Sequence, residues 1–283
     1  MRDSSQFPLI VDLDNTLILT DCLFEAFFYN LKKNFFKTLI IFFIYFFYKK
    51  KLKSYLFSNF QPDVNLVKIN NKVYEFLNKE RNLGRKIYLC SGSPSRIVKQ
   101  FSEKLKIFDG YFGTENINLV GENKRRFLNT KFTAYQYDYI GDSFSDIAVW
   151  NNSNKAYISK NNFLINFILK IKKVNFITIT EERNIFFNII NLLKLIRIHH
   201  WSKNVLLFLP IILAQKTSIS SVIVCLIGFF SFSFIASSIY IINDCLDLQN
   251  DRKHPEKKNR IIASGKIPLL NSAFVCFTLV IMS

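Results

Sequence analysis

The stretch FPLIVDLD at residues 7–14 places a short apolar run directly before two carboxylates, Asp12 and Asp14. Two later apolar runs have the same form, at residues 86–90 and 135–140. Segments with helical periodicity separate the three runs. Strands that alternate with helices in this way form parallel sheets. The sequence therefore predicts an α/β domain with a doubly wound parallel sheet.

Polar residues stand where each of the three predicted strands ends. Asp12 and Asp14 follow the first strand, Ser91 follows the second, and Asp142 follows the third. In open parallel sheets, ligands bind beyond the carboxyl ends of the strands. We therefore expect these four side chains to line one site.

The spacing of Asp12 and Asp14 suits phosphoryl chemistry. One carboxylate can attack phosphorus as a nucleophile, and the other can protonate the leaving oxygen and later activate water. Further along the chain, Lys124 lies in GENK, and Asp142 and Asp146 lie in GDSFSD. Phosphoryl transfer also needs a cation for the phosphate oxygens and carboxylates that hold Mg²⁺. These residues supply both, so the sequence predicts a Mg²⁺-dependent phosphohydrolase.

The four motifs resemble those of the haloacid dehalogenase superfamily, over roughly residues 7–160. The resemblance implies a Rossmann-like domain in which Asp12 forms an aspartyl-phosphate and Asp14 is the general acid and base. It implies that Ser91 and Lys124 bind the phosphate. It also implies a set of Mg²⁺ ligands: Asp12, the main-chain carbonyl of Asp14, Asp142 and the supporting Asp146.

The insertion at residues 18–68 falls where this superfamily places its substrate-selecting cap, so we expect a helical cap there. It contains FFKTLIIFFIYFFY at residues 35–48, with lysines on both sides. An apolar run of about 10–14 residues is too short to span a bilayer. Two interpretations remain open. The run is either an aromatic helix on a membrane surface, with its lysines towards the headgroups, or a buried helix of the cap.

The last part of the chain is predicted to be all-α and embedded in a membrane. Residues 205–214 and 219–242 are apolar, and the second run has 24 residues without a charge, enough to cross a bilayer. A third apolar run begins at Ala273. Residues 252–266 carry six Lys or Arg, whereas the link at 215–218 carries one. The positive-inside rule then predicts a multi-pass protein of the cytoplasmic membrane, with the hydrolase domain facing the cytoplasm.

Four oxygen-bearing side chains gather where the second apolar run ends: Asn243, Asp244, Asp247 and Asp251. Residues spaced by four share a helix face. Carboxylates at a membrane boundary are costly unless they bind cations, and hard oxygen ligands suit Mg²⁺ bridged to a diphosphate. Lys257 and Arg260, in the basic loop that follows, could contact the same phosphates. An ordinary charged cytoplasmic loop is the alternative interpretation.

The spacing NDxxDxxxDxxHPxKxxR resembles the first aspartate-rich motif of the UbiA-type prenyltransferases. Upstream, LIRIHHWSKNVLLFLP is similar to the first helix of the decaprenyl-phosphate phosphoribosyltransferase branch, where Arg197, Trp201, Lys203 and Asn204 match. By this resemblance, the reaction moves phosphoribose from phosphoribosyl diphosphate onto a polyprenyl phosphate. The resemblance also implies that Lys203 and Asn204 bind the diphosphate substrate together with the basic loop.

The transferase resemblance covers residues 190–283 alone, and such enzymes have further membrane helices and a second aspartate-rich motif. We therefore expect a hydrolase domain at residues 1–165, a linker at 166–189, and the N-terminal part of an incomplete UbiA-type bundle at 190–283. The expected function is a membrane-bound, Mg²⁺-dependent transferase of the phosphoribosyl type, fused to a phosphatase. Two alternatives remain: an aromatic-acceptor prenyltransferase, and a membrane-tethered phosphatase or inactive fragment.

The expected partners follow from charge and hydropathy. A formal charge of +17 could suit a nucleic acid or an anionic membrane surface. Since no nucleic-acid motif occurs, the apolar runs favour the membrane. We expect a membrane lipid, either a polyprenyl phosphate or a diphosphate, and a phosphorylated small molecule as ligands. The sequence predicts no nucleic-acid ligand and identifies no protein partner.

Overall fold

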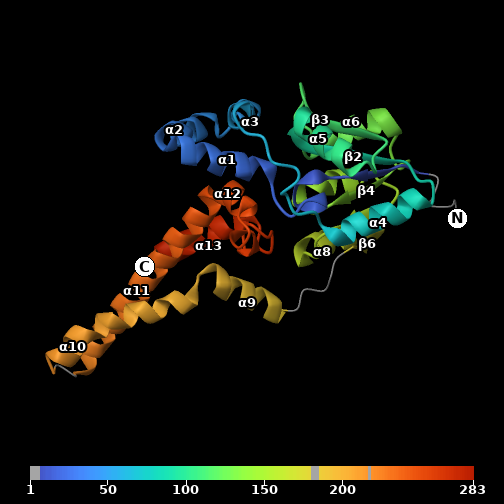
Figure 1. The fold of residues 1–283 in the computed structure, drawn as a ribbon. Coiled ribbons are helices and arrows are strands. Elements are labelled where there is room, and N and C mark those ends of the chain that lie inside the picture. Colours follow the sequence, from blue (N-terminus) through green and yellow to red (C-terminus); the bar gives the residue numbers. More distant parts are fainter. Residues whose placement is uncertain (1–6, 180–184, 216–217) are drawn as a thin grey trace. The chain divides into compact units, whose positions relative to one another are not determined.

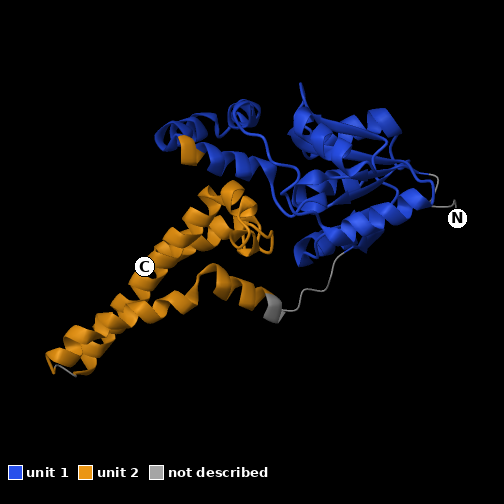
Figure 2. Cartoon of the chain, viewed as in Figure 1, with its two compact units in different colours: residues 1–30, 34–182 blue, residues 31–33, 183–283 orange. Residues whose placement is uncertain are grey.

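The protein is represented by a computed structural model that describes residues 7–179, 185–215 and 218–283. The chain divides into two compact units, shown in Figure 2. The first comprises residues 1–30 and 34–182, and the second comprises residues 31–33 and 183–283. The 215–218 link, which entered the prediction of membrane orientation, includes two positions outside the described residues.

The first unit is built on a six-stranded, wholly parallel sheet with the strand order β3-β2-β1-β4-β5-β6. The chain moves outward from β1 to β3 and then returns to β4 on the other side of β1, as Figure 1 shows. This doubly wound order confirms the predicted α/β fold. The strands are β1 (Leu9–Val11), β2 (Ile87–Pro94), β3 (Gly110–Thr114), β4 (Asp138–Gly141), β5 (Ala156–Ile158) and β6 (Phe176–Thr178).

Helices cover both faces of this sheet because successive strand side chains point to opposite faces. Leu9 and Val11 belong to one hydrophobic core, with side chains from α4 and α5, whereas Ile10 belongs to the other, with side chains from α6, α7 and α8. These helices are α4 (Asn71–Asn82), α5 (Ser95–Leu105), α6 (Glu122–Phe132), α7 (Ile147–Trp150) and α8 (Phe163–Ile171). The predicted boundary at residue 165 stays a prediction, although the sheet itself continues through β6.

The insertion between β1 and β2 is helical. It contains α1 (Cys22–Lys33), α2 (Phe35–Tyr45) and α3 (Lys49–Ser58). An antiparallel bridge between Ile18 and Ile69 closes its two ends. The aromatic run is divided, because α2 ends at Tyr45 and a turn precedes α3.

All the regular secondary structure in the described residues of the second unit is helical. It contains α9 (Ile185–Leu195), the 3₁₀ segment η4 (Ile198–Phe208), α10 (Leu209–Leu213), α11 (Ile219–Leu246), α12 (Leu248–Lys253), the 3₁₀ turn η5 (Lys257–Asn259) and α13 (Leu269–Met282). Within the described part of the chain, α11 alone is a helix both long and apolar enough to cross a membrane, with 28 residues. At about 2 Å per residue in η4 and 1.5 Å in α10, these two segments together extend about 30 Å.

Small polar residues on α11 allow its neighbours to approach closely. Ser233 and Ser237 are buried, and each accepts a hydrogen bond from η4. Asn204 Nδ2 donates to Ser233 Oγ at 2.8 Å, and Trp201 Nε1 donates to Ser237 Oγ at 3.0 Å. On another side, α13 packs against α11 through contacts between Ser238 and Cys276. Small and hydroxyl side chains are typical of helix interfaces in membranes.

Arg85, which precedes β2, is almost fully buried and ties several elements of the first unit together. Its guanidinium pairs with the carboxylate of Asp138, the first residue of β4, and with Glu80 of α4, where Nη1 lies 2.7 Å from Oε2. Asp138 has no exposed surface, and its other oxygen accepts hydrogen bonds from Asn154 Nδ2 and the Lys155 amide, both at 2.9 Å.

Replacing Arg85 should therefore destabilise the first unit. We expect Arg85→Met to lower the free energy of unfolding by about 3–5 kcal/mol, because it leaves the Asp138 carboxylate buried and unpaired. The control is Lys99→Met, since Lys99 pairs with Glu103 on an exposed surface, where the change should stay within about 0.5 kcal/mol. Hydrogen–deuterium exchange of β1 and β4 amides measures the change in stability of both variants. Equal protection in the two variants would contradict the prediction.

Candidate functional site

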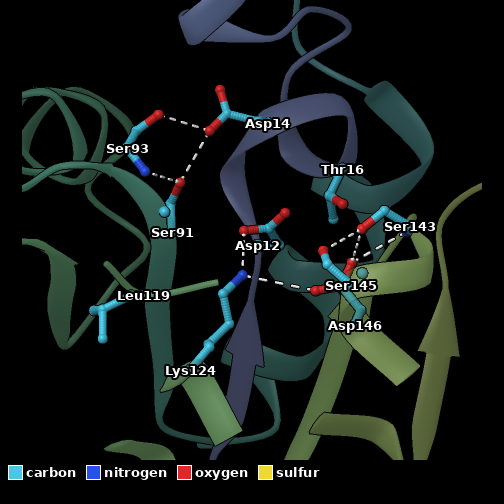
Figure 3. A network of polar contacts seen from close by, with 12 residues as sticks. Asp12, Asp14, Thr16, Ser91, Ser93, Leu119, Lys124, Ser143, Ser145 and Asp146 are labelled. Atoms are coloured by element: carbon cyan, nitrogen blue, oxygen red, sulfur yellow. Dashed lines mark hydrogen bonds and ion pairs between the residues drawn. The ribbon is translucent and has the colours of Figure 1, made fainter. Parts of the chain in front are cut away.

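Asp12 lies at the carboxyl end of β1, between the two strands that flank it. Its amide donates to Ile140 O of β4 at 3.0 Å. Lys124, from the first turn of α6, places Nζ 2.8 Å from Asp12 Oδ1, and both side chains are nearly buried. The same Nζ donates to the Tyr139 hydroxyl at 2.8 Å, and that hydroxyl donates to Asp146 Oδ1 at 2.7 Å. Figure 3 shows the Asp12–Lys124 pair at the centre of this network.

Asp14 is held beside Asp12 by three donors. Ser91 Oγ and Ser93 Oγ, near the end of β2, donate to Asp14 Oδ2 at 3.0 and 2.7 Å. The Cys22 amide, at the start of α1, donates to Asp14 Oδ1 at 2.8 Å. The turn after Asp14 has Asn15 in the left-handed region, with φ at 55°, a conformation that Asn tolerates better than most residues. The carboxylate therefore points towards the serines of β2, as Figure 3 shows.

Three carboxylates converge on one place at this edge of the sheet. One oxygen each from Asp12, Asp142 and Asp146 lies within 4.8 Å of the others. Burial, then the neighbouring carboxylates, raises the pKa of Asp142 to about 8. Burial also raises the pKa of Asp12 to about 7, although Lys124 opposes it. Among the described residues, no other group of three or more His, Cys, Asp or Glu is so close.

This cluster fits a hard divalent cation. Buried carboxylates so close together disfavour ionisation unless a positive charge lies among them, and a cation removes that penalty. Carboxylate oxygens are the ligands that Mg²⁺ accepts. The ammonium group of Lys124 supplies part of the positive charge that these carboxylates need. Burial lowers the pKa of this lysine, but the carboxylates of Asp12 and Asp146 outweigh that effect and raise the pKa above its ordinary value.

The loop after β4 fixes the position of Asp146. Asp146 Oδ2 accepts hydrogen bonds from Ser143 Oγ at 2.8 Å and from the Ser143 amide at 3.1 Å. A side chain at Gly141 would place its Cβ 2.8 Å from Asp146 Oδ2 and 2.9 Å from the Tyr139 ring. Only glycine therefore fits where the carboxylate approaches the strand.

Two charged residues of the cap also border the site, and neither is among the site residues predicted from the sequence. Lys53 of α3 donates from Nζ to Gly92 O at 2.7 Å and to Asn118 Oδ1 at 2.8 Å. Burial lowers the pKa of Lys53, while the charges of Asp14 and Asp21 act against this. Asp21 caps α1 by accepting from two amides of its first turn, and burial followed by the charge of Asp14 raises its pKa to about 7.

A local signal existed for one of these residues. An Asp directly before an apolar helical segment is typical of an N-cap, so the position of Asp21 could have been predicted. Lys53 is one of seven lysines in residues 26–62, and nothing local distinguishes it. Its role depends on how α3 packs beside β2.

In the second unit, Asp244 and Asp251 are paired with arginines. Arg197 Nη2 lies 2.7 and 2.8 Å from the two carboxylate oxygens of Asp244. Arg260 Nη1 lies 3.0 Å from Asp244 Oδ1 and 2.8 Å from Asp251 Oδ2. Asp247 keeps the predicted helical spacing, because its amide bonds to Asn243 O and its carbonyl accepts from the Asp251 amide, both at 2.9 Å. The predicted four-residue Mg²⁺ site stays a prediction.

A basic cavity of about 260 Å³ lies beside this cluster. Its polar lining comes from residues that are mostly cationic or neutral: Lys194, Arg197, His199, His200, Asn259 and Arg260, together with Asp244. Of the predicted diphosphate ligands, Arg260 borders this cavity and Asn204 is directed towards Ser233 of α11. Lys203 and Lys257 are exposed. Such a lining suits an anionic ligand.

Comparisons with known proteins bear on both units. No protein-family model matches the chain. An uncharacterized protein, y4nM of Sinorhizobium fredii, is 30% identical over 97% of this chain and 53% of its own length. The decaprenyl-phosphate phosphoribosyltransferase of Corynebacterium glutamicum is 38% identical over 81 residues, or 28% of this chain and 24% of that protein. The nodulation protein NoeC of Azorhizobium caulinodans is 37% identical over 84 residues, or 30% and 27%.

The transferase match falls in the C-terminal part of the chain and confirms the predicted likeness to the UbiA-type branch. The chain matches y4nM over almost all of its own residues, and it spans about half the length of that relative.

Two solved structures are similar to the first part of the chain. One is a Bordetella pertussis protein of unknown function, at 13% identity and a TM-score of 0.48 over 61% of this chain and 98% of that one. The other is a substrate-bound phosphoserine phosphatase, at 18% identity and a TM-score of 0.41 over 62% and 94%.

The carboxylate cluster predicts a pH-dependent affinity for Mg²⁺. With pKa values of about 7 for Asp12 and about 8 for Asp142, protons compete with the cation below pH 8. We expect Mg²⁺ to bind at least about 10-fold more weakly at pH 6 than at pH 8.5. Calorimetric titration measures this. An affinity for Mg²⁺ that does not change with pH would contradict the assignment.

Without the cation, these raised pKa values also make the free energy of unfolding fall as pH rises from about 4 to about 8, because the unfolded chain releases these protons at lower pH than the folded chain.

Proposed function

We propose that the first unit is a Mg²⁺-dependent phosphohydrolase that works through a phosphorylated Asp12. The observation that carries this proposal is the placement of Asp12 against Lys124, at 2.8 Å, with Asp14 beside it and oriented by Ser91 and Ser93. A nucleophile, an acid–base group, a cation and hydroxyl donors thus meet at one edge of the sheet.

Each residue has a defined part in the proposed reaction. An oxygen of Asp12 forms a bond to phosphorus while the bond to the alcohol oxygen breaks, and Asp14 gives its proton to that oxygen. Asp14 then takes a proton from water, whose oxygen attacks the phosphoryl group and releases inorganic phosphate and free Asp12. Lys124 and Ser91 hold the phosphoryl oxygens. A bound Mg²⁺, held by Asp12, Asp142 and the main-chain carbonyl of Asp14 with support from Asp146, would neutralise charge on those oxygens.

Loss of the nucleophile should abolish this activity. We expect Asp12→Asn to lower kcat for a soluble aryl phosphate by about 1,000-fold or more, because the amide cannot form the phosphoryl ester. Asp63→Asn makes the same chemical change outside the carboxylate cluster and should leave kcat unchanged. Phosphate release in the presence of Mg²⁺ gives the readout. An active Asp12→Asn variant would exclude Asp12 as the nucleophile.

For the second unit, we propose that it is the N-terminal part of a UbiA-type transferase of the polyprenyl-phosphate phosphoribosyltransferase kind. The 38% identity to the Corynebacterium enzyme supports this class. The basic cavity beside Asp244 and Arg260 supports an anionic ligand. Prenyl transfer to an aromatic acceptor is the second candidate, since the aspartate-rich motif alone also suits a prenyl diphosphate. The proposed location is the cytoplasmic membrane, with the hydrolase in the cytoplasm.

A labelling experiment tests the transferase proposal. Membranes that contain the full-length protein should convert labelled phosphoribosyl diphosphate and polyprenyl phosphate into a lipid-linked product. Asp244→Asn should lower this rate by about 100-fold, because the amide weakens both the pairing with Arg197 and any bound cation. Glu256→Gln, an exposed acid of the same loop, should retain the rate. A lipid product formed only from a prenyl diphosphate and an aromatic acid would favour the second candidate.

A further inference from the structure

The aromatic helix α2 presents an apolar stripe to solvent. Five large side chains follow the spacing of one helix face through α2 and the turn after it. They are Phe36 (79% exposed), Ile40 (59%), Phe43 (72%), Ile44 (59%) and Phe47 (88%). Soluble surfaces rarely expose so continuous an apolar stripe without a partner. We call residues 36, 40, 43, 44 and 47 the apolar stripe.

The opposite face of α2 fixes its orientation on the first unit. Thr38 is fully buried, and Ile41, Phe42 and Tyr45 pack against the hydrophobic core of that unit. The helix is therefore not free to rotate and bury its apolar stripe. Figure 1 shows α2 in the cap, on the side away from the sheet.

The charged residues that flank the stripe in the sequence are all positive. Residues 26–62 contain seven lysines and no Asp or Glu. Lys37 on α2 and Lys49, Lys50 and Lys51 at the start of α3 are exposed. The ammonium group of Lys51 lies 5.8 and 5.6 Å from the ring centres of Tyr45 and Tyr48. An apolar face bordered by lysines and tyrosines matches the layer where lipid headgroups meet acyl chains.

We propose that α2 lies in the surface of an anionic lipid bilayer, with its apolar stripe among the acyl chains and its lysines at the headgroups. At 1.5 Å per residue, its 11 residues extend about 16 Å, against about 30 Å for the hydrocarbon core. The helix therefore does not cross. A second copy of the chain is a poorer occupant, because it would bring the same lysines against these.

The contact of α2 with the bilayer also restricts which substrates reach the first unit, an inference that rests on the proposed phosphatase function. The lysines at the start of α3 are within one turn of Lys53, which donates to Gly92 O between the two serines that hold Asp14. A cap anchored in this way keeps the site beside the lipid surface. The substrate class is then a phosphate ester carried on a lipid.

Depth-dependent quenching of a single added tryptophan tests the membrane contact. The full chain is placed in nanodiscs of phosphatidylcholine and phosphatidylglycerol whose acyl chains carry bromine, and the emission of unsubstituted protein is subtracted. The variant is Phe47→Trp, and the matched control is Leu83→Trp, because Leu83 is also exposed (71%) but follows α4. We expect the added Phe47→Trp emission to shift to shorter wavelength and to be largely quenched. The added Leu83→Trp emission should not be quenched.

Three results would overturn the contact. Unquenched long-wavelength emission from Phe47→Trp means that water surrounds the stripe, and unquenched short-wavelength emission means that protein covers it. Equal quenching of Leu83→Trp means that the contact is not specific to α2.

The lysines are tested in the same Phe47→Trp background. Replacing Lys49, Lys50 and Lys51 together by Gln should lower the ratio of inserted to withdrawn helix by roughly 100-fold on anionic discs, at about fivefold for each lysine. Neutral phosphatidylcholine discs should produce a similar loss without any substitution. If quenching is unchanged in both cases, an anionic surface is not the occupant.

Activity separates this inference from the proposed function. Phe43→Ser with Phe47→Ser should lower hydrolysis of a long-chain alkyl phosphate in the discs by about 10-fold, while hydrolysis of a soluble aryl phosphate stays unchanged. If the double variant and the unsubstituted chain hydrolyse the lipid ester at equal rates, the inferred substrate class is overturned. If the unsubstituted chain hydrolyses neither ester, the phosphatase proposal fails, and the quenching result still decides the membrane contact.

Discussion

The position of β1 between β2 and β4 is the constraint on which the first unit depends. The parallel register aligns Val11 with Leu89 and Ile140, so the residues that leave the three strands meet at one edge. This arrangement concentrates negative charge, since Asp12, Asp142 and Asp146 lie close together and largely away from solvent. Lys124 offsets part of that charge, and burial still raises the pKa of Asp12 and Asp142, a penalty that a bound cation would relieve.

The cap is connected to this edge by hydrogen bonds at two places. The amide of Cys22, at the start of α1, holds one oxygen of Asp14, and Lys53 of α3 holds the carbonyl between the serines that bind the other oxygen. Any movement of the cap therefore acts directly on the proposed acid–base group. The same insertion carries the apolar stripe, so contact with a lipid surface and the geometry of the site involve one short segment.

The second unit shows how a polar cluster is kept where apolar helices end. Serines on α11 let η4 approach closely enough for Trp201 and Asn204 to donate hydrogen bonds. That packing places Arg197 against Asp244, and Arg260 joins Asp244 to Asp251. Carboxylates at such a boundary need compensating charge. For Asp244 and Asp251, arginine guanidinium groups provide it.

The sequence by itself determined the parallel sheet, the strand-end acids and the aspartate-rich motif, because periodicity and short spacings are local properties of the chain. The N-cap position of Asp21 could also be predicted from the local sequence. The roles of Lys53 and Ser93 could not, since they depend on contacts between α3 and β2 or across the first two strands, which no local pattern encodes. The same holds for Asn204, which matched a substrate-binding motif yet donates to Ser233. Only the tertiary structure decided which side of α2 is buried and which is exposed, because an apolar run that is nearly uniform in sequence carries no information about direction.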